Sequence, residues 1–348
     1  MRALAIVDYA RPLEAVELDV PHPDAGMVLV RVRACGVCYS DYKTATGRMP
    51  FSARLKLPHV PGHEIVGDVV ETGGGVTTLR VGQRVVVYNY WACGSCRSCR
   101  AGEETVCTDL KGWVGFTSPG GFQEYLVVPQ QYALAIPDSI PDIQAAALSC
   151  ATGTSYRAIV TRGRVVAGEW VLVVGIGGVG LQAVQIARAA GARVLAVDVD
   201  QHKLEVARTC GAVETALAGA DAAARVMDLT GGGADLVVDA AGRQESLDLA
   251  ARAVRPGGRV VMVGYVVGES RQIPSGETVL GEVSYLGTRY VRRDELARAI
   301  EMAASGAIQP VVDSVLDLEA ANDAFARVVG GEAAGRVVLR VHGELLDR

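Results

Sequence analysis

The chain has 348 residues, of which 50% are hydrophobic and 21% charged, and its formal net charge is −5. This length favours two domains over one, and the acidic balance argues against a nucleic-acid-binding protein, which usually carries a basic domain. No apolar run approaches the roughly 20 residues that cross a bilayer. Asp8 also interrupts the N-terminal apolar stretch too early for a signal peptide. We therefore expect a cytoplasmic protein with no membrane partner and no nucleic-acid partner.

The first 150 residues are expected to form a β-rich domain. Short β-branched segments between glycine and proline turn signals predict strands over 28–32, 66–71 and 84–87. From about Trp170, continuous apolar runs alternate with helical stretches, which is typical of an α/β fold with a parallel, doubly wound sheet. The strands predicted there are 171–174, 193–197, 234–239 and 259–263, and the helices are 179–190 and the alanine-rich 218–224. Beyond Gly287 the pattern predicts two amphipathic helices and a last strand, over 294–305, 318–329 and 337–341.

A glycine-rich turn joins the first of these apolar runs to the following helix. Its sequence is Gly175-Ile176-Gly177-Gly178-Val179-Gly180. This strand, motif and helix order is the context that a dinucleotide-binding fingerprint requires. Gly175 allows the tight turn, Gly177 lets the backbone approach a pyrophosphate, and Gly180 allows the helix to pack closely. The helix N-terminus then offers free N–H groups to the phosphates.

An acidic residue ends the next predicted strand. Asp198 lies eighteen residues after Gly180, where a carboxylate would accept hydrogen bonds from ribose hydroxyls and repel a 2′-phosphate. We therefore predict NAD as the cofactor rather than NADP. Lys203 could reach the same ribose or could be a solvated lysine at a helix start. The alternative is that the motif is only a glycine-rich turn between a strand and a helix, and that Asp198 is a solvated residue at the end of a strand.

Four of the eight cysteines lie within fifteen residues, in the pattern C-x2-C-x2-C-x7-C. They are Cys93, Cys96, Cys99 and Cys107. Four thiolates on one loop can surround a tetrahedral zinc ion and leave no position for water or substrate. The pattern predicts a structural zinc in a lobe of about residues 90–110, with iron as the open alternative. Cys35 and Cys210 are expected to be packing residues.

Further potential ligands are scattered along the chain: Cys38, the pair His63-Glu64, and Cys150. Two thiolates and one imidazole would leave a fourth zinc position open for water or substrate. Taken singly, each residue has an ordinary explanation. A lone cysteine is usually a small buried hydrophobe, and a histidine beside a glutamate usually lies at the surface.

Together these features resemble the zinc-dependent medium-chain alcohol dehydrogenases. The matching stretches are 36–41, 61–64 with Gly67, the four-cysteine loop, 120–125, 147–154 and the glycine fingerprint. Their order and spacing match across the whole chain. The resemblance implies a GroES-like β-rich catalytic domain interrupted by a Rossmann domain. The expected boundaries are 1–150, 151–287, and 288–348 for the return to the catalytic domain.

The resemblance also implies roles for single residues at the open site. Cys38, His63 and Cys150 would ligate the catalytic zinc. Glu64 would approach the metal during ligand exchange. Asp41 would orient the histidine ligand, an arrangement common at metal sites.

Other implied roles concern substrate and cofactor. Ser40 would take the substrate proton, Thr154 would pack near the nicotinamide, and Arg336 would contact the pyrophosphate. Trp91 would line the substrate pocket with help from Trp113, although both could be ordinary core residues. They favour an apolar substrate.

Two positions depart from common members of this family. Tyr39 stands where many have histidine or arginine, so a phosphate contact there is in doubt. Lys43 stands where many have the histidine that ends the proton relay. Lysine can shuttle protons if burial lowers its pKa. We hypothesise that Lys43 keeps the relay role, with a solvated lysine and a relay finished by water as the alternative.

The expected function is hydride transfer between an alcohol and NAD, with an aldehyde or ketone in the reverse direction. The expected cofactors are NAD and two zinc ions, one catalytic and one structural. The alternative is the same chemistry on a specialised secondary alcohol or an acyl-thioester hydroxy metabolite. Cys150 argues for the simple-alcohol branch, because polyol and threonine dehydrogenases usually carry glutamate there. Similar enzymes are mostly homotetramers, paired through the strand that corresponds to 283–288; a dimer is the alternative.

Overall fold

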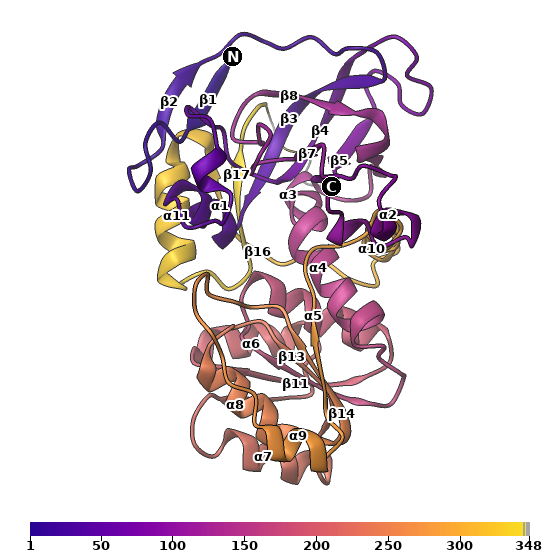
Figure 1. Cartoon of the computed structure of the whole chain (residues 1–348), viewed down its shortest axis with the longest axis vertical. Coiled ribbons are helices and arrows are strands. Elements are labelled where there is room, and N and C mark those ends of the chain that lie inside the picture. Colours follow the sequence, from indigo (N-terminus) through magenta and orange to yellow (C-terminus); the bar gives the residue numbers. More distant parts are fainter. Residues whose placement is uncertain (344, 346–348) are drawn as a thin grey trace. The chain divides into compact units, whose positions relative to one another are not determined.

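The computed structural model describes residues 1–343 and 345 and divides into two compact units (Figure 1). Unit 1 contains Met1–Cys150, Arg292–Ser305 and the described residues from Val312 onward. Unit 2 contains Ala151–Val291 and Gly306–Val311. The chain therefore leaves the first unit after Cys150, returns to it at Arg292, enters the second unit once more over Gly306–Val311, and ends in the first.

Unit 1 is built mainly from β-strands. Its strands are β1 (Arg2–Ala5), β2 (Glu14–Glu17), β3 (Met27–Val37), β4 (Glu64–Thr72), β5 (Arg84–Val87), β6 (Tyr90–Trp91), β7 (Gly112–Trp113), β8 (Tyr125–Pro129), β9 (Ala133–Ala135), β16 (Val312–Asp317) and β17 (Arg336–Arg340). Its helices are α1 (Tyr39–Ala45), α2 (Arg97–Arg100), α3 (Asp142–Ala146), α10 (Arg293–Ala304) and α11 (Ala321–Gly330). Its short 3₁₀ turns are η1 (Ser52–Arg54), η2 (Glu104–Val106), η3 (Gln130–Tyr132) and η6 (Leu318–Ala320).

The long strand β3 organises the sheet of unit 1. The strand order is β16-β17-β3-β4-β5-β9, and β8 also pairs with β3. All pairs except β16–β17 are antiparallel. Gly36, near the end of β3, pairs with Glu64 at the start of β4. Because the two strands run in opposite directions, the residues that follow β3 and those that precede β4 meet at one edge of the sheet.

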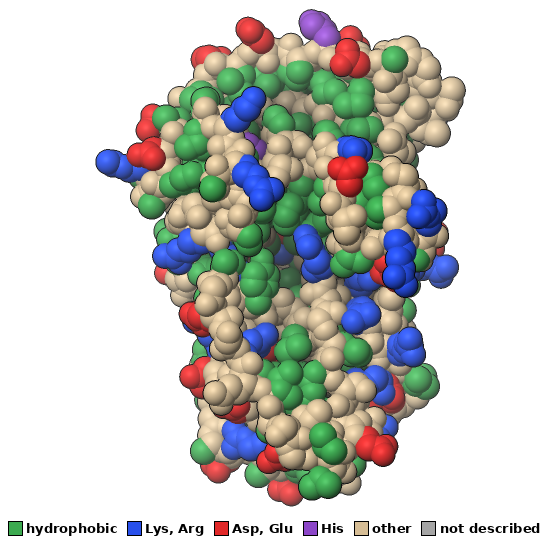
Figure 2. Space-filling view, viewed as in Figure 1, with side chains coloured by type: hydrophobic (Ala, Val, Ile, Leu, Met, Phe, Trp, Pro, Cys, Tyr) green, Lys and Arg blue, Asp and Glu red, His purple; other side chains and the backbone are tan. Residues whose placement is uncertain are grey.

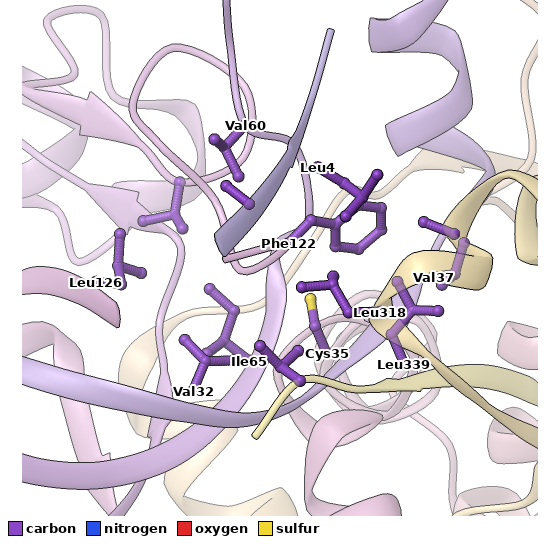
Figure 3. Packing of buried hydrophobic residues seen from close by; sticks show 14 of the residues in the cluster. Leu4, Val32, Cys35, Val37, Val60, Ile65, Phe122, Leu126, Leu318 and Leu339 are labelled. Atoms are coloured by element: carbon purple, nitrogen blue, oxygen red, sulfur yellow. The ribbon is translucent and has the colours of Figure 1, made fainter. Parts of the chain in front are cut away.

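The main core of unit 1 packs against this sheet (Figure 3). Phe122 is fully buried, among side chains from the N-terminal strand, from β3 and β4, and from β17 (Figure 3). Cys35 lies inside this cluster with no exposed surface, which confirms the packing role expected for it. Residues from both ends of the chain thus close one core, which accounts for the return of the chain to unit 1.

Unit 2 is a parallel α/β unit. Its strands are β10 (Trp170–Val174), β11 (Arg193–Asp198), β12 (Glu214–Leu217), β13 (Ala234–Asp239), β14 (Val254–Met262) and β15 (Ser284–Gly287). Its helices are α4 (Gly153–Tyr156), α5 (Gly178–Ala189), α6 (Gln201–Thr209), α7 (Ala222–Thr230), α8 (Gln244–Ala253) and α9 (Ser275–Leu280), and η5 (Arg157–Arg162) is a π-helical segment. A further π-helical segment, η4 (Leu148–Thr152), spans the junction between the units.

The sheet of unit 2 confirms the predicted doubly wound topology. Its strand order is β12-β11-β10-β13-β14-β15, and every pair is parallel. Counted from β10, this is the order 3-2-1-4-5-6 of dinucleotide-binding sheets. The order reverses between β10 and β13, and in such sheets ligands bind at that switch point, outside the carboxyl ends of the strands.

The predicted elements occur, with two differences worth noting. The alanine-rich helix predicted over 218–224 begins only at Ala222, because Gly219 and Asp221 lie in the turn that follows β12. The helix predicted over 318–329 is divided, with one 3₁₀ turn (Leu318–Ala320) followed by α11. Both differences concern helix starts, where propensity alone is a weak guide.

The face of the molecule shown in Figure 2 carries charged side chains of both signs among hydrophobic and other side chains. Among the described residues, none of the helices combines the length and the apolar character needed to cross a membrane.

The turn that begins α5 yields a stability prediction. A Cβ added at Gly180 would lie 2.0 Å from the carbonyl oxygen of Gly175. Alanine favours helices over glycine by about 1 kcal/mol, but overpacking costs about 1–3 kcal/mol. We therefore expect Gly180→Ala to lower the free energy of unfolding, as measured by urea denaturation. Gly177→Ala is the control, because its Cβ would meet nothing within 4 Å. A Gly180→Ala protein as stable as the control would contradict this account of the turn.

Candidate metal centres

The structure gathers the scattered ligand candidates into one group in unit 1. Cys38 follows β3 and caps α1, His63 and Glu64 lie at the start of β4, and Cys150 lies on η4. One donor atom from each of these four residues lies within 4.8 Å of the others. The arrangement follows from the antiparallel pairing of β3 with β4, because this pairing brings the first three residues to the same sheet edge.

Asp41 holds two of these residues in place. Its Oδ1 lies 2.6 Å from His63 Nδ1, and its Oδ2 accepts a hydrogen bond of 2.9 Å from the backbone N–H of Cys38. Burial opposes protonation of the imidazole, but the attraction and hydrogen bond of Asp41 outweigh it and raise the pKa of His63. Because Nδ1 is occupied by Asp41, Nε2 is the nitrogen available to a metal.

The pKa values of the two thiols of this group shift in opposite directions. The hydrogen bond from Cys150, together with the attraction of Arg336, lowers the pKa of Cys38. The hydrogen bond to Cys38, together with burial, raises the pKa of Cys150. A divalent cation would stabilise both thiolates. Two sulfurs and one imidazole nitrogen are ligands that zinc prefers, so the residues present fit the ion.

Glu64 is a buried carboxylate beside the group. Its Oε1 lies 2.9 Å from Arg336 Nη2 and 3.9 Å from His63 Nε2. Burial raises the pKa of Glu64 to about 8, against the opposing attraction of Arg336. The structure therefore places the Arg336 guanidinium, 7% exposed, against Glu64. The predicted contact of Arg336 with a pyrophosphate stays a prediction.

Two polar side chains of α1 lie near the same group. Ser40 Oγ lies 3.1 Å from Cys38 Sγ, which places the hydroxyl beside the candidate metal. Lys43 is only 7% exposed, and its Nζ lies 5.2 Å from the Tyr39 ring centroid. Burial lowers the pKa of Lys43. The alternative of a solvated lysine is therefore wrong, because the fold covers this side chain; its relay role stays a prediction.

An aromatic wall, which we define as Phe51, Trp113 and Phe116, adjoins the histidine. The ring centroids of Phe116 and His63 are 4.7 Å apart, those of Trp113 and Phe116 are 4.3 Å apart, and those of Phe51 and Trp113 are 5.2 Å apart. Sequence reasoning missed both phenylalanines. They are two of only four in the chain, and this scarcity was the one signal that could have drawn attention to them.

Trp91 lies elsewhere. In the β6–β7 ribbon, Tyr90 pairs with Trp113 and Trp91 pairs with Gly112. Successive side chains of a strand point to opposite faces, so Trp91 faces away from Trp113. It stacks on Tyr132 at 6.4 Å between centroids. Trp91 therefore does not join the aromatic wall. Of the two tryptophans predicted to line the substrate pocket, Trp113 is the one that lies in this wall.

The four clustered cysteines form a second, closed group. Their Sγ–Sγ distances are 3.9 Å for Cys93–Cys99, 3.4 Å for Cys96–Cys99, 3.9 Å for Cys96–Cys107 and 3.6 Å for Cys93–Cys107. Ligands on a tetrahedral zinc ion with bonds of 2.3 Å are separated by about 3.8 Å. The four sulfurs are thus spaced for such an ion, and every position around it would be filled by protein.

Backbone N–H groups donate hydrogen bonds to these sulfurs, which favours the thiolate form that binds a cation. The N–H of Cys96 points at Cys93 Sγ at 3.3 Å, and the N–H of Cys99 points at Cys96 Sγ at 3.5 Å. Hydrogen bonds from the backbone of Cys99 and Thr108 lower the pKa of Cys96 to about 5. Burial and the neighbouring thiols raise the pKa of Cys99 to about 12. The lobe favours negative charge on some sulfurs and opposes it on others, a conflict that a bound cation removes.

The glycine turn and the acid predicted to bind the cofactor meet in unit 2. Gly175 has φ +90°, and a Cβ there would lie 2.7 Å from the backbone nitrogen of Ala241, so the turn excludes a side chain. Asp198 Oδ2 accepts a hydrogen bond of 2.5 Å from the N–H of Ile176, and its Oδ1 accepts one of 3.0 Å from Asp200. Asp198 is 9% exposed. The alternative of a solvated strand end is therefore wrong.

The remaining cofactor candidates also lie in unit 2. Gly177 caps α5, and Gly178, Val179 and Gly180 form its first turn. Lys203 in α6 is 8% exposed, so it is not the solvated lysine of the alternative reading, and Thr154 in α4 is 6% exposed. Their contacts with a cofactor stay predictions.

The chain is similar to known proteins over almost its whole length. The family model for the alcohol dehydrogenase GroES-like domain matches residues 24–138, and that for zinc-binding dehydrogenases matches residues 178–305. An alcohol dehydrogenase of Geobacillus stearothermophilus is 39% identical over 342 residues, covering 98% of this chain and 100% of that protein. A NAD-dependent alcohol dehydrogenase of Sulfurisphaera tokodaii is 32% identical, covering 97% and 99%. The cobalt- and zinc-bound alcohol dehydrogenase of Pyrobaculum aerophilum superposes with a TM-score of 0.88 at 30% identity, covering 98% and 99%.

The chain belongs to the zinc-dependent medium-chain alcohol dehydrogenase family. This membership confirms the resemblance found in the sequence. It also confirms the fold class, a GroES-like β-rich domain combined with an inserted Rossmann sheet.

For this alcohol dehydrogenase family member we expect two zinc ions per chain, one in each group of ligands. Cys96→Ser and Cys150→Ser should each reduce the content to one, because each removes a ligand from a different group. Elemental analysis of the purified proteins measures the content. Cys210→Ser is the control, because Cys210 belongs to neither group. A Cys96→Ser or Cys150→Ser protein that still holds two zinc ions would contradict the assignment.

Proposed function

We propose that the protein is a zinc- and NAD-dependent alcohol dehydrogenase that transfers a hydride between an alcohol and the nicotinamide, with an aldehyde or ketone in the reverse direction. The observation that carries the proposal is the open set of donors Cys38, His63 and Cys150, with the Ser40 hydroxyl beside it. Catalysis is assigned to a domain of residues 1–150 and 288–348, and cofactor binding to residues 151–287.

Cys38, His63 and Cys150 would hold the catalytic ion, which supplies Lewis acidity that lowers the pKa of a hydroxyl group. Asp41 fixes the ring of His63 through Nδ1, so the imidazole keeps one orientation. Ser40 Oγ then accepts the substrate proton while it donates its own onward, and Lys43 receives it. Glu64, 3.9 Å from His63 Nε2, would approach the ion when ligands exchange.

NAD would bind at the switch point of the unit 2 sheet. The first turn of α5 supplies free N–H groups for the pyrophosphate, and Asp198 supplies a carboxylate for the adenosine ribose. The backbone hydrogen bonds from Ile176 and Asp200 hold that carboxylate in one orientation. We propose that Lys203 joins it at the ribose, that Thr154 packs near the nicotinamide, and that Arg336 reaches the pyrophosphate.

The substrate is proposed to be an alcohol with an apolar substituent. The aromatic wall of Phe51, Trp113 and Phe116 lies against His63, and apolar walls with few polar groups are typical of small-molecule sites. The Ser40 hydroxyl lies 3.1 Å from Cys38 Sγ, which suits recognition of a hydroxyl group at the proposed metal.

We propose that the protein assembles as a homotetramer, with a dimer as the alternative. Its proposed location is the cytoplasm. Edge strand β15 (Ser284–Gly287) closes one side of the unit 2 sheet. Val279 and Leu280 of the preceding helix α9 are 73% and 89% exposed. Two such exposed side chains beside a strand that ends the sheet of the described residues support an interface there. Light scattering measures the resulting oligomeric state.

The proposed function is tested by measuring NAD reduction with aliphatic, aromatic, allylic and polyol alcohols, with and without a chelator. We expect activity on apolar alcohols that the chelator abolishes, and a clear preference for NAD over NADP because Asp198 repels the 2′-phosphate. Asp198→Ala should reduce that preference. Absence of alcohol oxidation with either cofactor would overturn the proposed function, and a preference for NADP would overturn the role of Asp198.

The relay is tested at Lys43. Because burial lowers its pKa, the neutral amine that accepts a proton forms at a lower pH than in an exposed lysine. The rate of alcohol oxidation should therefore rise with pH through that lowered pKa. In Lys43→Ala we expect this rise to disappear and kcat to fall about 100-fold or more, the usual contribution of general base catalysis. Lys43→Arg is the control that keeps the charge but cannot lose its proton, and it should also lack the rise. An unmoved pH–rate profile in both variants would rule out the relay.

A further inference from the structure

A buried carboxylate that the proposed reaction does not use lies at the start of α3. Asp142 has no exposed surface, and both of its oxygens are engaged by arginines of the sheet. Oδ2 accepts a hydrogen bond of 2.7 Å from Arg33 Nε on β3, and Oδ1 accepts one of 2.6 Å from Arg84 Nη2 on β5. Two strands thus hold the first residue of this helix from two sides.

Arg84 also holds the segment that leads into the helix. It donates hydrogen bonds of 2.8 Å to the carbonyl oxygen of Ile140 and 3.3 Å to that of Pro137. Its side chain is 5% exposed. A single arginine of β5 therefore attaches both the approach to α3 and its first residue to the sheet.

This helix leads directly to Cys150. The chain passes from α3 into η4, which carries the cysteine. Asp142 precedes Cys150 by eight residues, and only Ala147 separates α3 from η4. Cys38 and His63 lie at strand ends that the pairing of β3 and β4 places together. Cys150 therefore depends on how the helix is attached to that sheet.

We propose that Asp142, with Arg33 and Arg84, positions Cys150 against the ligands that come from the sheet. The inference rests on the proposed catalytic metal site. Distances from a metal to its ligands tolerate changes of only about 0.2 Å. A shift of α3 against the sheet that exceeds this tolerance would carry η4 and the Cys150 sulfur out of position, because η4 follows α3 after a single residue. Asp142 is a positioning residue and need not touch the metal.

A neighbouring carboxylate offers a matched control. Asp68, 12% exposed at its side chain, also binds two arginines: its Oδ2 lies 3.0 Å from Arg31 Nη2 and 3.2 Å from Arg33 Nη1. Asp68 lies on β4, however, and its arginine partners lie on β3, so these ion pairs connect two strands of the sheet and not the sheet with α3. If the ion pairs of Asp142 and Asp68 contribute only to overall stability, loss of either carboxylate should change zinc release from the open site to the same extent.

The test measures zinc release from the full-length protein to a chelator, in Asp142→Asn, Asp142→Glu, Arg84→Gln and Asp68→Asn. The release phase that is missing in Cys150→Ser belongs to the open site, and the remaining phase belongs to the four cysteines. Spectra of the cobalt-loaded protein, after subtraction of the spectrum of cobalt-loaded Cys150→Ser, report the ligand geometry of the open site independently of activity.

In Asp142→Asn we expect release from the open site to accelerate about 10-fold to 100-fold, the usual effect of losing a partner that orients a metal ligand. Release from the four-cysteine site should be unchanged. Arg84→Gln should act in the same direction, Asp142→Glu should restore much of the retention, and Asp68→Asn should leave both phases unchanged. If Asp142→Asn does not fold, Arg84→Gln decides the outcome alone.

Unchanged release from the open site in the folded Asp142→Asn and Arg84→Gln proteins would overturn the inference. An equal acceleration in Asp68→Asn would overturn it too, because the effect would then be one of general stability. A wild-type protein that holds no zinc at the open site, or that oxidises no alcohol, would instead overturn the proposed function. The zinc content and the activity of the wild-type protein are therefore measured before any variant is made.

Discussion

The antiparallel pairing of β3 with β4 is the constraint on which the rest of unit 1 depends. It sets Gly36 opposite Glu64, so the residue two positions beyond Gly36 and the residue just before Glu64 come within reach of one another. Asp41 then links them, through the backbone of Cys38 and the ring of His63. Without this register the two ligands would be separate loop residues of no chemical consequence. With this register, Cys38 and His63 are already close together, and Cys150 is the one proposed ligand of the open site that another part of the chain must supply.

The open site concentrates ionisable groups that water would normally solvate. Two thiols, an imidazole, two carboxyl groups and a guanidinium lie together, and none of the ionisable groups of Asp41, His63, Glu64 and Arg336 is more than 7% exposed. Burying charge is costly unless each charge has a partner. The raised pKa values of Glu64 and Cys150, to which burial contributes, express that cost. A divalent cation bound by Cys38, His63 and Cys150 would supply the missing positive charge and so reduce the cost of burying these groups.

The two metal groups differ in how much of their geometry is local. The four cysteines need only one loop, because the turns between them already bring the sulfurs to 3.4–3.9 Å. The open site instead draws on two strand ends and a helix. Such a site is sensitive to any contact that moves one element against another, which is why the buried ion pairs of Asp142 bear on it. The ligands of the closed lobe, in contrast, all lie within fifteen residues of one another.

The sequence by itself determined the features that rest on local spacing or on a repeated pattern. The four-cysteine lobe, the glycine turn with its strand and helix, and the parallel sheet of unit 2 all follow from short-range order, and the structure contains them. Only the tertiary structure decided which side chains are covered and which way they point. Lys43 is buried although lysines usually lie in solvent. Trp91 and Trp113 lie on opposite faces of one ribbon, because a shift of one residue reverses the face. The pairing of Asp142 with Arg33 and Arg84 joins residues up to 109 positions apart. Such contacts depend on how strands and helices meet, and no pattern along the chain encodes that meeting directly.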